Sequence, residues 1–464
     1  MTEILVAALA ALILMSFFVT PLARDSQSFY RGWAEGGRPP GVLTLTFSQV
    51  TTWIFARSLL TAAILGFYFG IAGGIAYAAY YLSFLTGWAI VDHLRFRHGY
   101  TSIQDFMRDR FGGLGTSTYN FLIALRLISE VFANLLVVGI IFGTAGSAIY
   151  LLAIGATAVV TLAYSMIGGL RASLRTDVLQ MSLFLALMVL IMIALIDLPE
   201  TSFSAIGASS PLELENGWNL LLVALLQVWS YPMHDPVMMD RGFIADRRTT
   251  RASFLHAAWI SVICILGFSL LGVVAGLEAQ QGEEMMAVLA RLLGDTTMLL
   301  VNLALVLSAI STLDSTFSSA AKLAIADMRI GQPTVANGRI AMALFALGGL
   351  VFLWLGTDDL YAAVAVSGTA SLFLAPVIFF CIWGNMAIPR WSYLTAFIAA
   401  IAGAALYYAE SGGHAEIIAP LTGITVKYNK LLLISATVLV IGNGAFALGA
   451  WLRRPAAAKP ADTA

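Results

Sequence analysis

Long apolar stretches, separated by short polar segments, dominate the pattern of this chain of 464 residues. A helix needs about 20 apolar residues to cross the hydrocarbon core of a bilayer. Thirteen stretches meet this requirement, and we expect each of them to form a membrane-spanning helix. They cover residues 2–22, 43–65, 69–92, 118–143, 148–167, 174–197, 218–238, 253–276, 297–321, 340–356, 361–383, 391–409 and 430–452.

The basic residues predict how these helices cross the bilayer. If the N-terminus lies outside and the chain crosses thirteen times, twenty of the 25 Lys and Arg residues fall in or beside inside loops. Only Arg291, Lys427 and Lys430 then lie outside. Cytoplasmic loops normally carry an excess of Lys and Arg. We therefore expect an outside N-terminus and a cytoplasmic tail at 453–464.

Composition supports a chain surrounded by lipid. Hydrophobic residues make up 59% of it and charged residues 11%, whereas soluble domains carry about 25% charged residues. The net charge of −1 argues against a nucleic-acid partner, which requires a basic face. Cys264 and Cys381 both lie in apolar runs, so we expect neither a disulfide scaffold nor a cysteine metal site. No linker divides the chain, which we interpret as one transmembrane domain over residues 1–464.

Two of the expected spans contain residues that interrupt a membrane helix. The span 43–65 is rich in hydroxyl and amide side chains before Arg57, and 218–238 contains Pro232 and Pro236. Proline removes a backbone donor and breaks a helix. The two spans are five apart, so they occupy matching places in two inverted halves, a pattern that indicates a transporter site. A proline-kinked packing helix and a hydroxyl-rich contact helix are the alternative interpretation.

The span 297–321 carries a stripe of Ser and Thr residues with an acidic residue, Asp314. The spacing places most of these side chains on one helical face. Ser311 lies about 15 Å from the inner end, near the midplane. Hydroxyls together with carbonyls from a broken helix offer an all-oxygen site for an alkali cation. Packing between helices is the alternative role for such a stripe.

Charged side chains also occur inside the expected membrane region. Arg126 and Glu130 are spaced i, i+4, and such groups face a partner or a water-filled cavity. They could form an internal ion pair. Arg57 could pair with Glu130 or meet an anionic substrate. Asp177 begins the span 174–197, where an acidic residue is favourable without any further function.

Three segments resemble motifs of the sodium/solute symporter family. Residues 168–180 (GGLRASLRTDVLQ) resemble its "GG…TD..Q" signature, residues 308–315 (SAISTLDS) its sodium-binding helix, and residues 101–112 its cytoplasmic loop. The resemblance covers about residues 40–385. Its members take up proline, pantothenate, monocarboxylates, sugars, choline or sialic acid with sodium.

The resemblance implies an all-α polytopic protein with a LeuT-type core. The two inverted five-helix repeats would be residues 43–197 and 218–383. An extra N-terminal helix would occupy 2–22 and two extra C-terminal helices 391–452. The expected location is a bacterial plasma (inner) membrane. Two loop segments, 101–111 and 282–293, have helical patterns of their own and are expected as a surface helix and an outer lid.

The resemblance also implies ligands for Na⁺. Ser311 and Thr312 would supply hydroxyl oxygens, and Ser308 its carbonyl oxygen. Phe47 and Val50 would supply carbonyl oxygens from the broken span 43–65.

Some members of the family hold a second sodium ion nearer the inner side. The matching positions in this chain are Asp177, Ser311, Asp314 and Ser315. Asp314 could strengthen that site, bind a proton or pair with Lys322.

The substrate site is expected beside the two helix breaks at the midplane. The expected lining residues are Trp53, Arg57, Glu130, Trp229, Tyr231, His234 and Asp235. The arginine favours a carboxylate, whereas the acidic side chains favour an amine, so a zwitterion suits both.

Together these features predict a symporter that couples a sodium gradient to import of a small organic solute by alternating access. A proton-coupled transporter of the same fold, with Asp177, Asp314 or Glu130 titrating, and a solute sensor without net flux are the alternatives. An enzyme is not expected, because the five histidines form no metal-ligand spacing and neither a phosphate loop nor a GxSxG motif occurs. The oligomeric state is left open.

Overall fold

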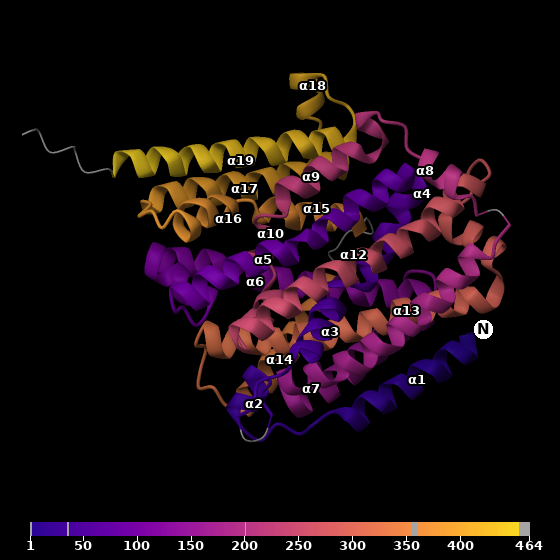
Figure 1. Ribbon diagram of the computed structural model, residues 1–464, viewed down its shortest axis with the longest axis horizontal. Coiled ribbons are helices and arrows are strands. Elements are labelled where there is room, and N and C mark those ends of the chain that lie inside the picture. The colour runs from indigo at the N-terminus through magenta and orange to yellow at the C-terminus, as the bar shows by residue number, and fades with distance from the viewer. Residues whose placement is uncertain (1, 35–36, 200, 354–359, 454–464) are drawn as a thin grey trace, which may run out of the picture.

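The computed structural model describes residues 2–34, 37–199, 201–353 and 360–453, and over these residues the regular structure is entirely helical. The helices form one elongated bundle (Figure 1). The all-α class expected from the sequence is therefore confirmed.

Eight helices in the described part of the chain are long and apolar enough to cross a membrane, or nine if one bent pair counts as a span. They are Ala56–Arg97, Ile103–Phe142, Ala148–Ile196, Arg247–Glu278, Met285–Asp327, Val335–Phe352, Arg390–Ser411 and Lys427–Leu452, with the pair Ala365–Ser371 and Leu374–Trp383 bent by 41°. This count does not establish the thirteen crossings expected from the sequence.

The lower count has a physical origin in kinks and breaks. α7 (Ala148–Ile196) would be about 74 Å long if straight, far more than the ~30 Å core of a bilayer. It turns at Gly169, whose φ of 55° is non-helical, between the expected spans 148–167 and 174–197. Conversely, α3 (Val42–Trp53) and α9 (Asn219–Gln227) are too short to cross alone, because the chain breaks after each of them.

The remaining elements are as follows. They are α1 (Thr2–Val19), α2 (Ser26–Arg31), α4 (Ala56–Ala79), η1 (Tyr80–Leu82), α5 (Ser83–Val91), η2 (Asp92–Arg97), α6 (Ile103–Phe142), α8 (Phe203–Ala208), η3 (Leu214–Trp218), α10 (Tyr231–His234), α11 (Pro236–Gly242), α12 (Arg247–Glu278), α13 (Met285–Ala321), η4 (Lys322–Asp327), α14 (Val335–Phe352), α15 (Leu360–Ser371), α16 (Leu374–Pro376), η5 (Val377–Trp383), α17 (Arg390–Ser411), α18 (Ile418–Thr422) and α19 (Lys427–Leu452).

Both loop segments with helical patterns are helical. Ser102 caps α6 by accepting a hydrogen bond from the Asp105 backbone N–H, and α6 turns at Gly112 (φ 70°). α13 begins at Met285 and turns at Gly294 (φ 69°). Positive φ is accessible to glycine at little cost, so these glycines separate the loop helices from the apolar segments that follow.

α4 and α12 pack with their backbones in close approach. A Cβ atom on Gly272 would lie 1.8 Å from the Ala63 carbonyl oxygen, and one on Gly276 would lie 2.4 Å from that of Phe67. The pair is a small-xxx-small motif, which brings membrane helices together. This contact joins the segment after the first break to the second half of the chain.

The helices at the two ends of the chain lie outside the central group. α1 packs along α7 and α13, whereas α17 and α19 pack together beside α15 and α9 (Figure 1). The C-terminal tail expected at 453–464 lies, apart from Arg453, outside the described residues.

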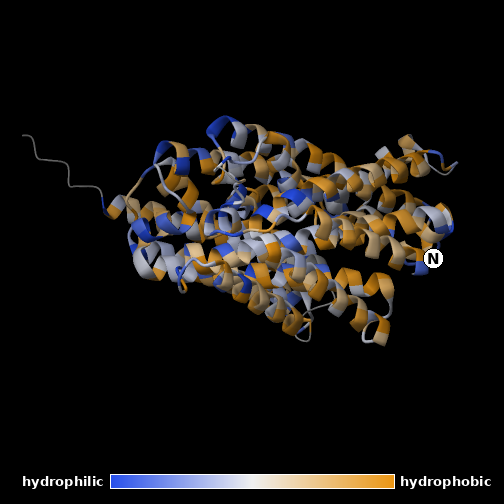
Figure 2. Ribbon diagram, turned by 90° about the horizontal axis from the view of Figure 1, so that it is seen from below, coloured by the Kyte–Doolittle hydropathy of each residue, from blue (hydrophilic) through white to orange (hydrophobic). Residues whose placement is uncertain are grey.

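Apolar residues make up much of the helices (Figure 2), and many large apolar side chains are exposed. Phe18 is 92% exposed, and Leu152 and Val440 are each 72% exposed. In contrast, polar and charged side chains such as Asp177 and Arg241 are completely buried. A soluble protein has the opposite distribution, so the chain is an integral membrane protein.

Candidate ion and solute site

The first helix break lies between α3 and α4. α3 ends at Trp53, Ile54 leaves the helical region (φ −82°, ψ 70°), and Phe55 precedes α4 in an extended conformation. The last carbonyl groups of a helix have no partner within it. The break therefore frees backbone oxygens in the interior of the protein.

The second break separates α9, α10 and α11. Pro232 and Pro236 each occupy the first turn of a new helix, where a missing N–H costs nothing. Asp235 caps α11, because its Oδ1 accepts the Met238 N–H at 2.9 Å. Both interruptions predicted from the sequence are present.

The hydroxyls of α13 face the first break. Thr312 Oγ1 lies 3.4 Å from the Thr51 carbonyl oxygen and 2.9 Å from that of Ser308. The Ser308 hydroxyl donates a hydrogen bond to the Ile54 carbonyl. Two carbonyls from the break and two α13 residues thus gather their oxygens in one place, with Ser311 on the same face.

The expected carbonyl donors Phe47 and Val50 are not part of this cluster. The Phe47 carbonyl accepts the Thr51 hydroxyl at 2.8 Å, and the Val50 carbonyl accepts the Ile54 N–H at 2.8 Å. Both carbonyls therefore have partners within the chain at the end of α3, which continues to Trp53. The carbonyls that face α13 are instead those of Thr51 and Ile54. They are three residues apart, as Phe47 and Val50 are.

Three of the four residues expected at a second sodium position meet. Asp177 Oδ1 lies 3.0 Å from Ser311 Oγ and 3.3 Å from Ser315 Oγ. Asp314 does not share these hydrogen bonds, because its two oxygens accept from Ser165 at 2.8 Å and from Thr176, the α7 residue before Asp177, at 2.5 Å.

Asp314 also has no contact with Lys322, one of the partners considered for it. Lys322 Nζ pairs with Asp240 at 2.7 Å and with Asp327 at 2.9 Å. Among the described residues, the hydrogen bonds that Asp314 accepts come from hydroxyl groups, those of Ser165 and Thr176.

Buried charges surround the second break. Arg126 forms ion pairs with Glu130 and, at 3.4 Å, with Asp235, and the three side chains are fully buried. Glu130 Oε2 also lies 3.4 Å from the Thr316 hydroxyl. The internal Arg126–Glu130 ion pair considered from the sequence is therefore present, and Asp235 extends it.

Arg57 is a further buried cation, which feels the charges of Arg126 and Glu130 without forming an ion pair in this network. It is 2% exposed, and no described residue forms an ion pair with it within 4 Å. Its Nε has no hydrogen-bond partner in the described part of the chain, and its guanidinium lies over the Phe55 ring at 5.8 Å. A buried, unpaired donor of this kind is costly unless a ligand satisfies it.

Aromatic rings line a small cavity beside these charges. The Trp53 ring makes edge contacts with Tyr81 at 5.4 Å and Tyr231 at 5.6 Å, and Tyr80 contacts Tyr231 at 5.9 Å. Tyr77 and Tyr80 also line this cavity. Three of these tyrosines, at 77, 80 and 81, were missed in the sequence analysis, although their i, i+3, i+4 spacing places them on one helical face.

Of two other expected lining residues, His234 lies beside the aromatic cavity and Trp229 lies away from it. His234 is buried and its ring lies 6.0 Å from that of Tyr231. Trp229 is 41% exposed and contacts Phe379 and Trp383. Trp229 therefore does not join the others, because its side chain points out of the bundle at the end of α9.

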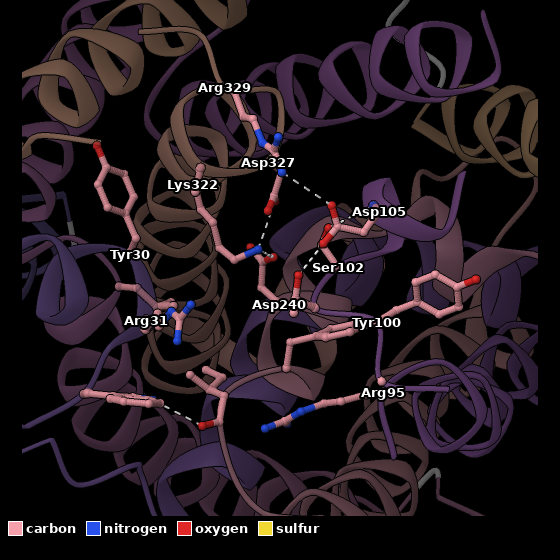
Figure 3. A pocket seen from close by; sticks show the side chains of 17 residues that line it. Tyr30, Arg31, Arg95, Tyr100, Ser102, Asp105, Asp240, Lys322, Asp327 and Arg329 are labelled. Carbon is pink, nitrogen blue, oxygen red and sulfur yellow. Dashed lines mark hydrogen bonds and ion pairs between the residues drawn. The ribbon is translucent and has the colours of Figure 1, made fainter. Parts of the chain in front are cut away.

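Charged and aromatic side chains line a polar cavity of about 470 Å³ (Figure 3). The Lys322 amine sits between Asp240 and Asp327, and Arg329 lies 3.8 Å from Asp105. The lining comes from five segments that the sequence places on the inside, namely 23–42, 93–117, 168–173, 239–252 and 322–339. These loops therefore meet on one side of the protein.

A column of polar side chains on α13 and at the start of η4 lies between the first break and this cavity. Thr312, Ser315, Ser319 and Lys322 follow one another at helical spacing, and all are buried or nearly so. Neighbouring helices supply bonding partners to each of them. Polar side chains therefore continue from the first break to the lining of this cavity.

Solved structures of membrane transporters share this fold. A Na⁺-coupled sialic acid symporter, in a substrate-bound outward-open state, matches with a TM-score of 0.71 and 14% sequence identity over 96% of this chain and 97% of that one. A manganese transporter from Eremococcus coleocola matches with a TM-score of 0.55 and 11% identity over 88% of this chain and 95% of that one. No protein-family profile and no curated protein matches by sequence.

Proposed function

We propose that this protein is a sodium-coupled symporter that imports a small organic solute bearing a carboxylate. The observation that carries the proposal is the meeting of the Thr51 and Ile54 carbonyls with the hydroxyls of Ser308 and Thr312. Neutral oxygens suit a hard monovalent cation. The ion would be held where α13 crosses the first helix break, with Ser311 as a further ligand.

The fold supports alternating access as the mechanism. Broken helices at the midplane of two inverted repeats form the binding sites of many secondary transporters. We assign the repeats to 43–197 and 218–383, within thirteen crossings that begin outside. The five segments that share the polar cavity support this assignment, since each would be a loop on the same side.

Sodium would couple to this motion by bridging two units. Thr51 and Ile54 belong to the first repeat, and Ser308 and Thr312 to the second. An ion bound to both favours the state in which the units are close, and it drives a change only through its different affinity for the two states. The energy of the sodium gradient is thereby converted into solute uptake.

The solute class follows from Arg57. Its guanidinium is buried without a carboxylate partner, whereas Glu130 and Asp235 are both engaged by Arg126. A carboxylate on the solute would satisfy the guanidinium, which binds such groups in a bidentate manner. The aromatic rings of Trp53, Tyr77 and Tyr231 would hold the apolar body of the solute.

The proposal is tested by uptake into proteoliposomes that contain the purified protein. A panel of radiolabelled amino acids and monocarboxylates is offered under an inward sodium gradient or an inward choline gradient. We expect at least one carboxylate to accumulate under the sodium gradient and not under the choline gradient. Equal accumulation under both gradients would contradict sodium coupling.

Asp314 supports one second candidate, proton coupling on the same fold. It is completely buried and its described partners are hydroxyl groups of Ser165 and Thr176, which can also bond a protonated carboxyl. Uptake that follows an imposed pH gradient in the absence of sodium would favour this candidate.

A further inference from the structure

Arg241 lies at the centre of a buried cluster of hydroxyls. Its side chain is completely buried on α11. The Nε atom donates to Ser48 Oγ at 3.1 Å, Nη1 to Ser319 Oγ at 3.2 Å, and Nη2 to Ser173 Oγ at 3.2 Å and to Ser315 Oγ at 3.1 Å. The guanidinium thus bridges α3, α7 and α13.

Asp177 uses the same hydroxyls. Its carboxylate lies 2.6 Å from Ser48 Oγ and 3.3 Å from both Ser173 Oγ and Ser315 Oγ. The Arg241 guanidinium completes the set at 3.8 Å from Asp177 Oδ2. The Asp177 carboxylate and several neutral hydroxyl oxygens therefore surround a positive charge, as in an ion-binding site. Here the positive charge is the Arg241 guanidinium.

We propose that the Arg241 guanidinium is a tethered counter-ion that fills the second cation position at Asp177, so that the protein carries one mobile sodium ion instead of two. This inference rests on the proposed function for its consequence in transport. The supporting observation is geometric. The hydroxyl oxygens around the position already accept hydrogen bonds from the Arg241 guanidinium, so they are not available as ligands for sodium.

The chemistry of arginine suits this role. A buried carboxylate such as Asp177 is strongly destabilising without a positive partner. The guanidinium stays protonated in proteins and presents five donors in a fixed fork. Unlike a bound ion, it is not released at the inner face, so the site contributes rigidity between α3, α7 and α13 without contributing to the driving force.

Sodium binding to the purified protein tests the inference. Bound ²²Na⁺ is measured by equilibrium dialysis for the wild type and for Arg241→Ala, Arg241→Met and the double variant Arg241→Ala/Asp177→Asn. Arg241→Ala opens the position and leaves Asp177 in need of a cation. We expect the bound sodium in Arg241→Ala to be about double that of the wild type at saturation.

The other two variants are matched controls. Methionine also removes the charge but fills part of the space of the side chain, so Arg241→Met should gain less sodium than Arg241→Ala. The double variant removes the charge that would attract the ion, so the gain should disappear. Two sodium ions on the wild type, or no gain in a folded Arg241→Ala, would overturn the inference.

Asp177→Asn keeps the inference testable if the Arg241 variants fail to fold. With Arg241 as the tethered cation, Asp177 is no sodium ligand, and the variant should still bind as much sodium as the wild type. A loss of bound sodium in Asp177→Asn would overturn the inference.

If the wild type binds no sodium, the proposed symport fails. In that case, a gain of bound sodium in Arg241→Ala that disappears in the double variant would still support Arg241 as the tethered cation. No gain of bound sodium in Arg241→Ala would refute this role of Arg241.

Discussion

The hydroxyl of Thr312 lies 3.4 Å from the carbonyl oxygen of Thr51, although 261 positions separate the two residues in the chain. The contact joins α13 to the last turn of α3. It exists because α3 ends at Trp53 and leaves its final carbonyls without partners in the helix. A cation between these helices would replace this hydrogen bond by ligation from both oxygens.

Replacing Thr312 by alanine removes one of the proposed ligands. We expect half-maximal solute uptake to require roughly tenfold more sodium, equivalent to about 1.4 kcal/mol of binding free energy. Thr312→Ser keeps the hydroxyl and should behave like the wild type. Uptake measured across a sodium titration distinguishes the variants, and an unchanged sodium requirement in Thr312→Ala would remove Thr312 from the site.

Arg57 should determine solute binding rather than sodium binding. Arg57→Gln removes the positive charge, so we expect uptake of a carboxylate to fall by a factor of ten or more. Arg57→Lys should recover only part of it, since a lysine ammonium lacks the bidentate fork. Sodium-dependent thermal stabilisation should persist in both variants. A carboxylate that is transported normally by Arg57→Gln would contradict this role.

The ion-pair network of Arg126 should stabilise the fold. Arg126→Met leaves the Glu130 and Asp235 carboxylates buried without their cation. Breaking a buried pair in this way costs about 3–5 kcal/mol, so we expect a marked fall in the melting temperature, measured in detergent by tryptophan fluorescence. The triple variant that also carries Glu130→Gln and Asp235→Asn should recover stability, because no charge remains unpaired. A melting temperature unchanged in Arg126→Met would refute this assignment.

Trp53 and Trp229 form a matched pair for the solute site. Trp53 is buried against Tyr81 and Tyr231, whereas Trp229 is 41% exposed. Trp53→Ala should reduce solute uptake strongly, because it removes a wall of the aromatic cavity, while Trp229→Ala should leave uptake within about twofold. If Trp229→Ala reduced uptake more than Trp53→Ala, the solute would not bind at the aromatic cavity beside Trp53 and Tyr231.

Packing between α4 and α12 gives a prediction for stability alone. A Cβ on Gly272 would meet the Ala63 carbonyl oxygen at 1.8 Å, so Gly272→Ala must push the helices apart. We expect a loss of about 1–3 kcal/mol in the free energy of unfolding. Gly155→Ala on α7 is the control, because its Cβ would meet nothing within 4 Å. Equal stability of the two variants would show that the close approach is unimportant.

Much of the fold could be predicted from the sequence, because bilayer physics restricts it. The apolar stretches are helical where the structure describes them, and Pro232 and Pro236 marked the second break. The hydroxyls of Ser308 and Thr312 lie against the first break, a contact that the family resemblance implied, whereas Ser311 bonds Asp177 on α7.

The details that failed depend on tertiary contacts. The resemblance implied Phe47 and Val50 as carbonyl donors, but their carbonyls accept the Thr51 hydroxyl and the Ile54 N–H, and the sequence does not show where α3 ends. Arg241 was counted only as an inside charge. Its four hydroxyl partners come from three other helices, and no local pattern shows that they converge.

The central claim is a sodium site between α3 and α13, and thermal unfolding in detergent tests it without any solute. Choline chloride is replaced by sodium chloride or by potassium chloride at constant ionic strength. A bound ion stabilises the folded state by RT ln(1 + [L]/Kd). We predict a saturable rise in melting temperature with sodium, absent with potassium and lost in Thr312→Ala but not in Thr312→Ser. A wild-type protein whose melting temperature is the same in the three salts would contradict the site.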